Sequence, residues 1–422
     1  MPQLEARLGA LQEPQFRLLW LARTSSFFGD SLIGVALAFA VLSESRSALA
    51  LGSVLAVFTL SRVALTLVGG VYADRLPRRA VMLACDGIRA VVEAFTAGML
   101  LTGHMTLPLF FVTAGVFGAA SAFFGPASTG LVPQTVSSER LQAANALLDM
   151  SQSSTNIFGP LLSGLLVAGI GAGWVFAIDA ATFVVSALFL LRLAIPDYDR
   201  PVAQHFLRDL ARGLNEVRSR TWVWLPMAAF SITNLSFAAF LVLGPVVARD
   251  ELGGARQWGV IAMGGAIGAL AGATVALRVH PRRPLAVGFA GWILCGLPLL
   301  ALAPPLPTLA VAAAEGIGLA GISFGTALWQ TTLQRRIPQD VLARVSSFDW
   351  VVSLGFMPIG FVAFGPLAQA IGTATTLVVA GIVIAAANLL VALAPPVRGV
   401  EDVTRGGGDV APTPQLKPKP SS

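Results

Sequence analysis

The stretch from residue 373 to residue 394 reads TATTLVVAGIVIAAANLLVALA and contains no charged side chain. An α-helix needs about 20 consecutive apolar residues to cross the hydrocarbon core of a bilayer. The stretch shows no strand-like alternation, and a helix satisfies its own backbone polar groups in lipid. It therefore predicts a membrane-spanning helix.

Stretches of the same kind recur along the whole chain. Of 422 residues, 55% are hydrophobic and 12% are charged, whereas a soluble globular protein carries about 25% charged residues. The expected spans are 17–42, 49–72, 79–101, 106–128, 142–169, 173–193, 222–247, 257–277, 284–303, 306–329, 346–369 and 373–394. We therefore predict an all-α membrane protein with twelve transmembrane helices.

The distribution of basic residues predicts how these helices are oriented. Outside the spans, only Arg46, Arg249 and Arg256 of the 28 basic residues fall in odd-numbered connections. Because basic loops stay in the cytoplasm, we expect both termini to be cytoplasmic. The net charge of +6 reflects this topology, so no nucleic-acid partner is expected.

The chain repeats itself at an offset of about 201 residues. The matching landmarks are Phe124-Gly125 with Phe324-Gly325, Glu139 with Asp340, Gly159 with Gly360, and Gly164 with Gly365. We therefore expect two six-helix bundles, and parallel repeats place a binding site between the halves near the middle of the bilayer. The predicted divisions are bundles at 1–194 and 222–396, a cytoplasmic linker at 195–221 and a disordered tail at 397–422. In the linker, Phe206, Leu210, Leu214 and Val217 predict an amphipathic surface helix.

A short loop after the span 49–72 carries the most specific motif. Residues 70–79 read GVYADRLPRR, with landmarks at Gly70, Asp74, Arg75, Arg78 and Arg79. The glycine permits close helix packing, and the aspartate can accept hydrogen bonds at a helix N-terminus, where the dipole favours an anion. A basic cytoplasmic loop would explain the arginines but not the glycine or the aspartate. The loop resembles the Gly-x-x-x-Asp-Arg-x-x-Arg-Arg loop of the major facilitator superfamily.

The resemblance covers residues 17–394 and implies the twelve-helix fold of that superfamily. It also implies that Asp74 contacts the start of the span 346–369, near Arg344 and Asp349, and latches the cytoplasmic side closed. The corresponding connection of the second half keeps Pro281-Arg282-Arg283 but lacks the Asp-Arg pair. We therefore expect an asymmetric gate.

A second motif lies in the span 142–169. Residues 159–164 read GPLLSG and resemble the Gly-Pro-x-x-Gly-Gly core found in exporting antiporters, with serine in place of one glycine. Pro160 removes a helix hydrogen bond, while Gly159 and Gly164 permit close packing. These details are similar to the bacterial drug:proton antiporter branch that includes siderophore and macrolide exporters.

The resemblance implies secondary active export of a small amphipathic molecule, such as a drug, macrolide or siderophore, coupled to protons by alternating access. We expect a functional monomer in the bacterial inner membrane, without enzymatic activity, cofactor or metal. Import by the same fold, and a non-transporting sensor or lipid-handling protein, remain alternatives.

Ionisable residues inside the spans are candidates for the transport site, because each costs roughly 2.5–3.5 kcal/mol at mid-span. The resemblance implies that the first helix of each three-helix unit lines the cavity, which places Asp30, Glu315 and Asn234 there. Either carboxylate could carry the transported proton. Alternatively, Asp30 forms a structural ion pair with Arg62, which could instead meet an anionic substrate, and Asn234 serves helix packing.

Other charged residues and motifs have simpler explanations. Asp86, Arg89 and Glu93 share one helix face and neutralise one another, which favours a structural network. An ATP-binding loop requires a lysine, and Lys417 and Lys419 in the tail are the only ones in the chain. The stretch 321–325, GISFG, fits a hydrolase motif, but that motif needs a strand-to-helix turn rather than a position inside a span.

Overall fold

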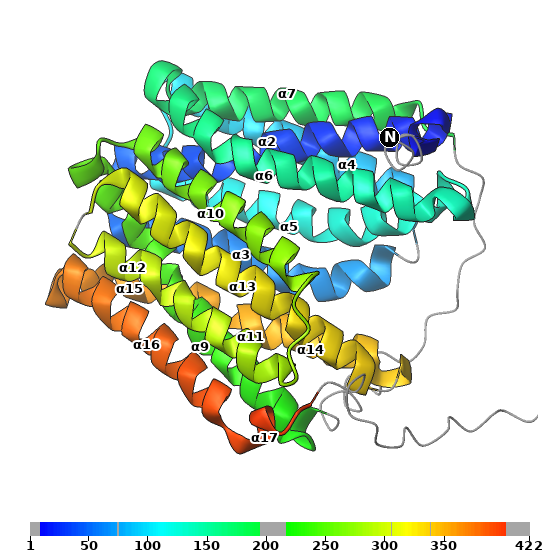
Figure 1. The fold of residues 1–422 in the computed structure, drawn as a ribbon. Coiled ribbons are helices and arrows are strands. Elements are labelled where there is room, and N and C mark those ends of the chain that lie inside the picture. Colours follow the sequence, from blue (N-terminus) through cyan, green and yellow to red (C-terminus); the bar gives the residue numbers. More distant parts are fainter. Residues whose placement is uncertain (1–8, 74–75, 195–216, 305, 338, 402–422) are drawn as a thin grey trace, which may run out of the picture.

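The computed structural model describes residues 9–73, 76–194, 217–304, 306–337 and 339–401, and every regular element in these ranges is helical (Figure 1). The first six long helices are α2 (Pro14–Ser45), α3 (Ala48–Ala73), α4 (Arg78–Leu101), α5 (Leu107–Leu131), α6 (Leu141–Ile170) and α7 (Ala172–Leu191). The second set comprises α9 (Thr221–Val247), α10 (Ala255–Ala276), α11 (Pro284–Ile293) with α12 (Leu297–Leu302), α13 (Thr308–Arg336), α14 (Gln339–Gly355) with α15 (Met357–Ile371), and α16 (Thr373–Leu393). Shorter helical turns are η1 (Gly9–Gln12), η2 (Val132–Gln134), η3 (Ser138–Arg140), η4 (Ala248–Leu252), η5 (Leu294–Gly296) and α17 (Pro395–Arg398).

The predicted all-helical membrane fold is confirmed. Eleven helices in the described ranges are long and apolar enough to cross a bilayer. The remaining predicted span corresponds to α4, which has 24 residues but carries Asp86, Arg89 and Glu93 in its apolar stretch. All three side chains are buried among other helices, so α4 contains them without exposing charge to lipid.

Two spans are interrupted rather than continuous. The turn η5 separates α11 from α12. The span expected at 346–369 consists of α14 and α15, which meet at Phe356 just before Pro358. A proline lacks the N–H that a continuous helix would use, which accounts for the second interruption. The amphipathic helix predicted around Phe206 falls mainly within residues 195–216, outside the described ranges.

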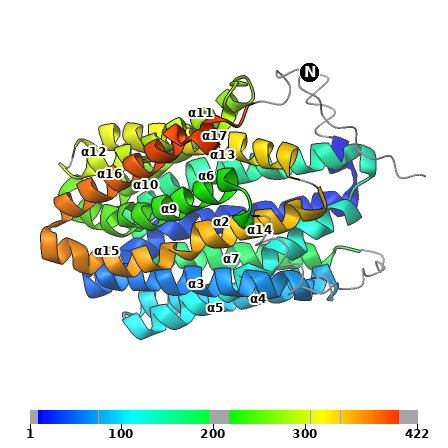
Figure 2. The same ribbon diagram turned by 90° about the horizontal axis from the view of Figure 1, so that it is seen from below.

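The helices form two groups that touch mainly along two pairs, with smaller contacts between α3 and α9, α2 and α10, α3 and α14, and α2 and α9. Figure 1 shows α6 beside α10, and Figure 2, seen from below, shows α15 beside α3; both pairs are in contact. Because successive spans alternate in direction, the connections α2–α3, α6–α7, α9–α10 and α15–α16 share one end of the molecule, called the loop end here. The opposite end, where residues 9 and 401 lie, is called the terminal end.

Glycines bring the two groups together near the loop end. A methyl group added at Gly164 on α6 would lie 2.5 Å from the Ala255 carbonyl oxygen on α10. One added at Gly365 on α15 would lie 2.7 Å from the Leu49 nitrogen on α3. Only a residue without a side chain allows these backbones to approach so closely. The two glycines are partners in the sequence repeat, and they make equivalent contacts.

The other predicted residues of the export-like motif also lie in close packing. A methyl group at Gly159 would lie 2.1 Å from Ser31 Oγ on α2. The Pro160 carbonyl oxygen would lie 2.4 Å from a methyl group at Gly259 on α10. Thus the motif joins α6 to a helix of its own group and to a helix of the other group.

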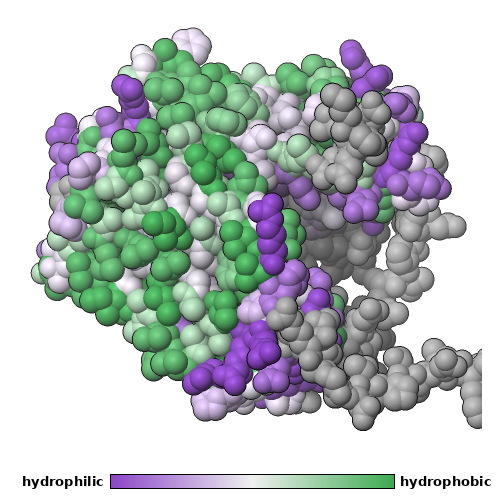
Figure 3. Space-filling model, in the orientation of Figure 1, coloured by the Kyte–Doolittle hydropathy of each residue, from purple (hydrophilic) through white to green (hydrophobic). Residues whose placement is uncertain are grey.

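The outer surface of the bundle is largely apolar. Large hydrophobic side chains such as Val91, Leu309 and Leu390 are at least 70% exposed, on α4, α13 and α16 respectively. Figure 3 shows hydrophobic side chains over much of one face, with hydrophilic ones gathered mainly toward the helix ends. An exposed apolar surface of this extent suits contact with lipid.

We expect Gly164→Ala to lower stability by about 1–3 kcal/mol, because the added methyl group overpacks a backbone contact. The matched control is Gly169→Ala on the same helix, where an added methyl group meets nothing within 4 Å. Unfolding of the purified protein by titration with dodecyl sulfate measures both variants. Equal stability of the two variants would contradict the role of the Gly164 contact.

Candidate functional site

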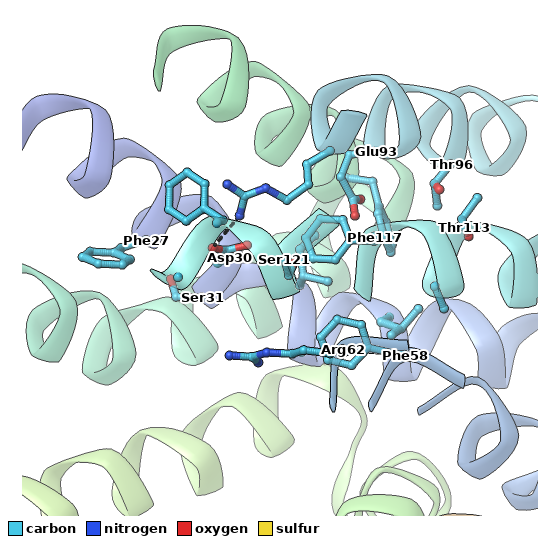
Figure 4. Close-up of a pocket in the computed structure, with 18 of the residues that line it drawn as sticks. Phe27, Asp30, Ser31, Phe58, Arg62, Glu93, Thr96, Thr113, Phe117 and Ser121 are labelled. Atoms are coloured by element: carbon cyan, nitrogen blue, oxygen red, sulfur yellow. Dashed lines mark ion pairs between the residues drawn. The ribbon is translucent and has the colours of Figure 1, made fainter. Parts of the chain in front are cut away.

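A cavity of about 500 Å³ lies among the first six long helices. Its lining includes Arg23, Phe27, Asp30, Ser31, Phe58, Arg62, Arg89, Glu93, Phe117, Phe124, Gln152 and Asn156. All of its lining residues come from α2 to α7. A site between the two halves was expected, whereas the walls of this cavity belong to the first group of helices alone. Figure 4 shows the side chains converging from α2, α3, α4 and α5.

Asp30 lies on α2 and lines this cavity. Its carboxylate Oδ2 lies 3.5 Å from Arg89 Nη1 on α4, the ion pair drawn as a dashed line in Figure 4. The side chain of Asp30 is 38% exposed, whereas that of Arg89 is only 2% exposed. The structural partner of Asp30 is therefore Arg89.

Arg89, and not Arg62, forms the ion pair with Asp30, although Arg62 lies within electrostatic range of the same carboxylate. Arg62 lies on α3 and also lines the cavity (Figure 4). In the part of the chain that the structure describes, no carboxylate forms an ion pair with Arg62. The rotation of α4, which sequence spacing does not fix, turns Arg89 rather than Arg62 toward Asp30.

Arg89 is held in a fixed position by its surroundings. Its guanidinium donates a hydrogen bond to Asp86 Oδ1, whose other oxygen accepts one from Ser186 Oγ at 2.6 Å. The carbon atom of the guanidinium lies 4.1 Å and 4.3 Å from the ring centres of Phe124 and Phe183. A desolvated cation between two aromatic faces is stabilised by both rings. The expected neutralisation within α4 therefore extends to α2, α5 and α7.

Two further carboxyl groups lie deep in this region. Glu93 on α4 and Asp179 on α7 are 3% and 0% exposed. Both are within electrostatic range of Asp30 and Arg89. Among the described residues, no hydrogen-bond donor reaches Glu93 Oε2 or Asp179 Oδ2. The carboxylate of Asp179 packs against Gly29, next to Asp30.

Glu315 lies away from this cavity. It is 4% exposed on α13 and packs against Gly265 of α10, where an added methyl group would lie 3.2 Å from its Oε1. No hydrogen-bond donor in the described ranges reaches Glu315 Oε2. The predicted cavity residues Asp30 and Glu315 are therefore not brought together.

Polar residues of the second group serve the packing of their own helices. Asn234 Nδ2 donates to the Phe230 carbonyl oxygen at 3.0 Å, and Asn234 does not line the cavity. Trp329 Nε1 donates to Asp349 Oδ2 at 2.9 Å, which ties α13 to α14. The Asp349 carboxylate is therefore buried and engaged within the second group.

The gating loop is only partly within the described ranges. Arg78 donates a hydrogen bond to the Gly130 carbonyl oxygen near the C-terminus of α5. Arg79 donates to the Leu190 and Leu191 carbonyl oxygens at the C-terminus of α7, at 2.8 and 2.6 Å. These arginines therefore bind helix C-termini, where the dipole favours a cation.

The remaining residues of the loop cannot be placed in this way. The backbone of Gly70 belongs to α3, while Asp74 and Arg75 fall outside the described residues. The contact expected between Asp74 and the start of the span 346–369 therefore stays a prediction. Among the described residues, no group of three His, Cys, Asp or Glu side chains could hold a metal ion.

Comparison with known proteins identifies the family. The model of the Major Facilitator Superfamily matches residues 19–354. The multidrug efflux pump Tap of Mycobacterium tuberculosis is 27% identical over 414 residues, which cover 92% of this chain and 95% of the relative. The enterobactin exporter EntS of Escherichia coli is 28% identical over 341 residues, which cover 79% of this chain and 80% of the relative.

Two solved structures share the fold. A mutant of the nucleoside transporter NupG superposes with a TM-score of 0.68 at 15% identity, covering 89% of this chain and 98% of that one. A bacterial homologue of the human lysosomal transporter Spinster, inward-facing and unoccupied, gives 0.67 at 16% identity, covering 89% and 96%. With the family model matching most of its length, the chain belongs to the Major Facilitator Superfamily of membrane transporters.

Proposed function

We propose that this transporter exports a small amphipathic molecule in exchange for protons, by alternating access. The direction is supported by the relatives, since the efflux pump and the exporter each match at least 79% of the chain. The chemistry is supported by one observation above all: several carboxyl groups surround a single arginine beside the cavity.

The charges of this cluster do not balance when every group is ionised. Asp30, Asp86, Glu93 and Asp179 would contribute −4, while Arg89 and Arg62, which both lie within electrostatic range of Asp30, contribute +2, which leaves −2. Uncompensated charge in a low-dielectric interior is costly, and carboxyl groups avoid the cost by taking up protons. The cluster therefore supplies protonatable groups next to the place where a substrate would bind.

Asp30 is the group that connects the cluster to the cavity. Its partner Arg89 is buried, whereas Asp30 itself is open to the cavity. Protonation of Asp30 removes its attraction to Arg89, and deprotonation restores it. A ligand or proton shifts a conformational equilibrium only by its differential affinity for the two states, and a change in this ion pair provides such a difference.

The arrangement of the helices supports the alternating part of the proposal. The two groups meet closely near the loop end, at Gly164 and Gly365. The cavity extends toward the terminal ends of its helices, where Arg23, Thr129 and Gln152 line it. With cytoplasmic termini, as the basic loops predict, this arrangement corresponds to a conformation closed to the outside. Exchange with the opposite conformation would require the glycine contacts to separate.

Glu315 is a second proposed proton carrier, at a distance from the cavity. Its carboxyl group is buried between α13 and α10, and its Oε2 finds no donor among the described residues. An ionisable residue in this setting is a functional candidate by default, because its burial is expensive. Since Glu315 does not line the cavity, its proposed role concerns coupling and not substrate binding.

We expect Asp30→Asn to reduce proton-driven transport at least tenfold, because the amide cannot exchange a proton while Arg89 keeps its contact with Asp86. The measurement is uptake of ethidium and of 2-naphthoate into inverted vesicles under an imposed pH gradient. The matched control is Asp250→Asn, which alters a carboxylate at the loop end that is 50% exposed and paired with Arg249. Proton-driven transport by Asp30→Asn at the normal rate would refute the proposed role.

For Glu315→Gln we expect a similar loss of proton-driven transport, with substrate dissociation constants that change less than twofold. Substrate binding should be almost unchanged because Glu315 does not line the cavity. Transport in the same vesicles and equilibrium binding to the purified protein provide the two measurements. Glu251→Gln, at an exposed position of the loop end, is the control, and an unchanged transport rate in Glu315→Gln would rule out coupling through this residue.

A further inference from the structure

We propose that the cavity binds an amphipathic organic anion, with Arg62 as the residue that recognises its negative group. The inference rests on the proposed function, which it deepens by assigning a charge to the transported substrate. It follows from which charges line the cavity, which of them are already paired, and what surrounds them.

The acidic residues of the cavity are paired or buried. Asp30 is paired with Arg89, and Glu93 is only 3% exposed. An organic cation would therefore have to compete with Arg89 for Asp30. Because Arg89 is fixed by Asp86 and by two aromatic rings, it cannot easily move away from such a competitor.

The basic residue Arg62 differs from these acidic residues, because it is neither buried nor part of an ion pair among the residues that the structure describes. Its side chain is exposed to the cavity and forms no ion pair within the described ranges, although it lies within electrostatic range of Asp30, which Arg89 already pairs. An unpaired arginine inside a membrane span costs roughly 2.5–3.5 kcal/mol on insertion scales, so its position calls for a function. The planar guanidinium offers two parallel donors that match a carboxylate, sulfonate or phosphate group.

Arg23 adds to the positive character of the same space. It lines the cavity from α2, with its guanidinium carbon 5.0 Å from the centre of the Phe27 ring. No acceptor among the described residues reaches its Nε atom. Asp149 on α6 lies within electrostatic range of Arg23 and offsets part of its charge. An anion in the cavity would therefore meet the exposed arginine on α3 first, with a second, partly compensated arginine on α2.

Aromatic and amide side chains complete a site for an amphipathic ligand. Phe58 lies one turn from Arg62 on α3, and its ring centre is 6.1 Å from that of Phe117 on α5. On the α6 wall, Gln152 and Asn156 are exposed, one helical turn apart. The rings suit an apolar or aromatic body, whereas the amides offer hydrogen-bond donors and acceptors to polar substituents.

Equilibrium binding to the purified full-length protein tests the charge preference with three probes of one shape. These probes are 2-naphthoate, its neutral amide 2-naphthamide, and the cation 2-naphthylmethylammonium. We expect the wild-type protein to bind the carboxylate at least tenfold more tightly than the amide. Arg62→Gln should remove this preference by weakening carboxylate binding and leaving amide binding unchanged, while Arg62→Lys should retain most of it. Arg282→Gln, an exposed arginine in the connection between α10 and α11, is the charge-matched control.

Three results would overturn the inference: tighter binding of the cation, carboxylate binding that Arg62→Gln leaves intact, or no carboxylate binding up to millimolar concentrations. Uptake into inverted vesicles distinguishes failure of the anion site from failure of the proposed proton-coupled export. Proton-driven transport of ethidium without any preference for anions would sustain proton-coupled export and reject the anion site. Tighter binding of the carboxylate, without any transport coupled to protons, would sustain the anion site and reject proton-coupled export.

Discussion

The guanidinium of Arg89 is the interaction on which the first group of helices depends. It contacts Asp30 on α2 and Asp86 on its own helix, and it lies between rings from α5 and α7. Because an unpaired buried charge is strongly destabilising, the rotation of each of these helices must keep its contribution in place. The same requirement places more carboxyl groups than arginines around this position. Helix packing and the proposed proton binding therefore depend on the same side chains in this bundle.

The helices themselves could be predicted from the sequence, because lipid imposes a length and an apolar composition on every span. The span 79–101, which corresponds to α4, was predicted in the same way even though it carries three charged residues. The repeat was also visible, and its partners Gly164 and Gly365 make equivalent contacts. Interruptions such as the one at Phe356 were missed, because they depend on local backbone geometry within an apolar stretch.

The site was predictable in part. A carboxylate in an apolar span is conspicuous, so Asp30 and Glu315 could be singled out, and Asp30 lines the cavity. Which partner reaches Asp30 was not predictable, because spacing along one helix does not determine its rotation or height relative to a neighbour. Arg62 was therefore assigned a contact that Arg89 makes. The division into bundles at 1–194 and 222–396 stays a prediction, as does the latch at Asp74.

The paired glycine contacts at the loop end bear on how the two halves could have arisen. Gly164 on α6 meets α10, and its repeat partner Gly365 on α15 meets α3, the equivalent helix of the other half. Reciprocal contacts of this kind define the interface of a two-fold symmetric dimer, in which the same surface is used twice. A half-length ancestor that paired with a second copy of itself would have needed only one such glycine. Fusion of two such copies would free the halves to diverge, which fits a chain in which one half has the arginine-centred cluster and the other an isolated glutamate.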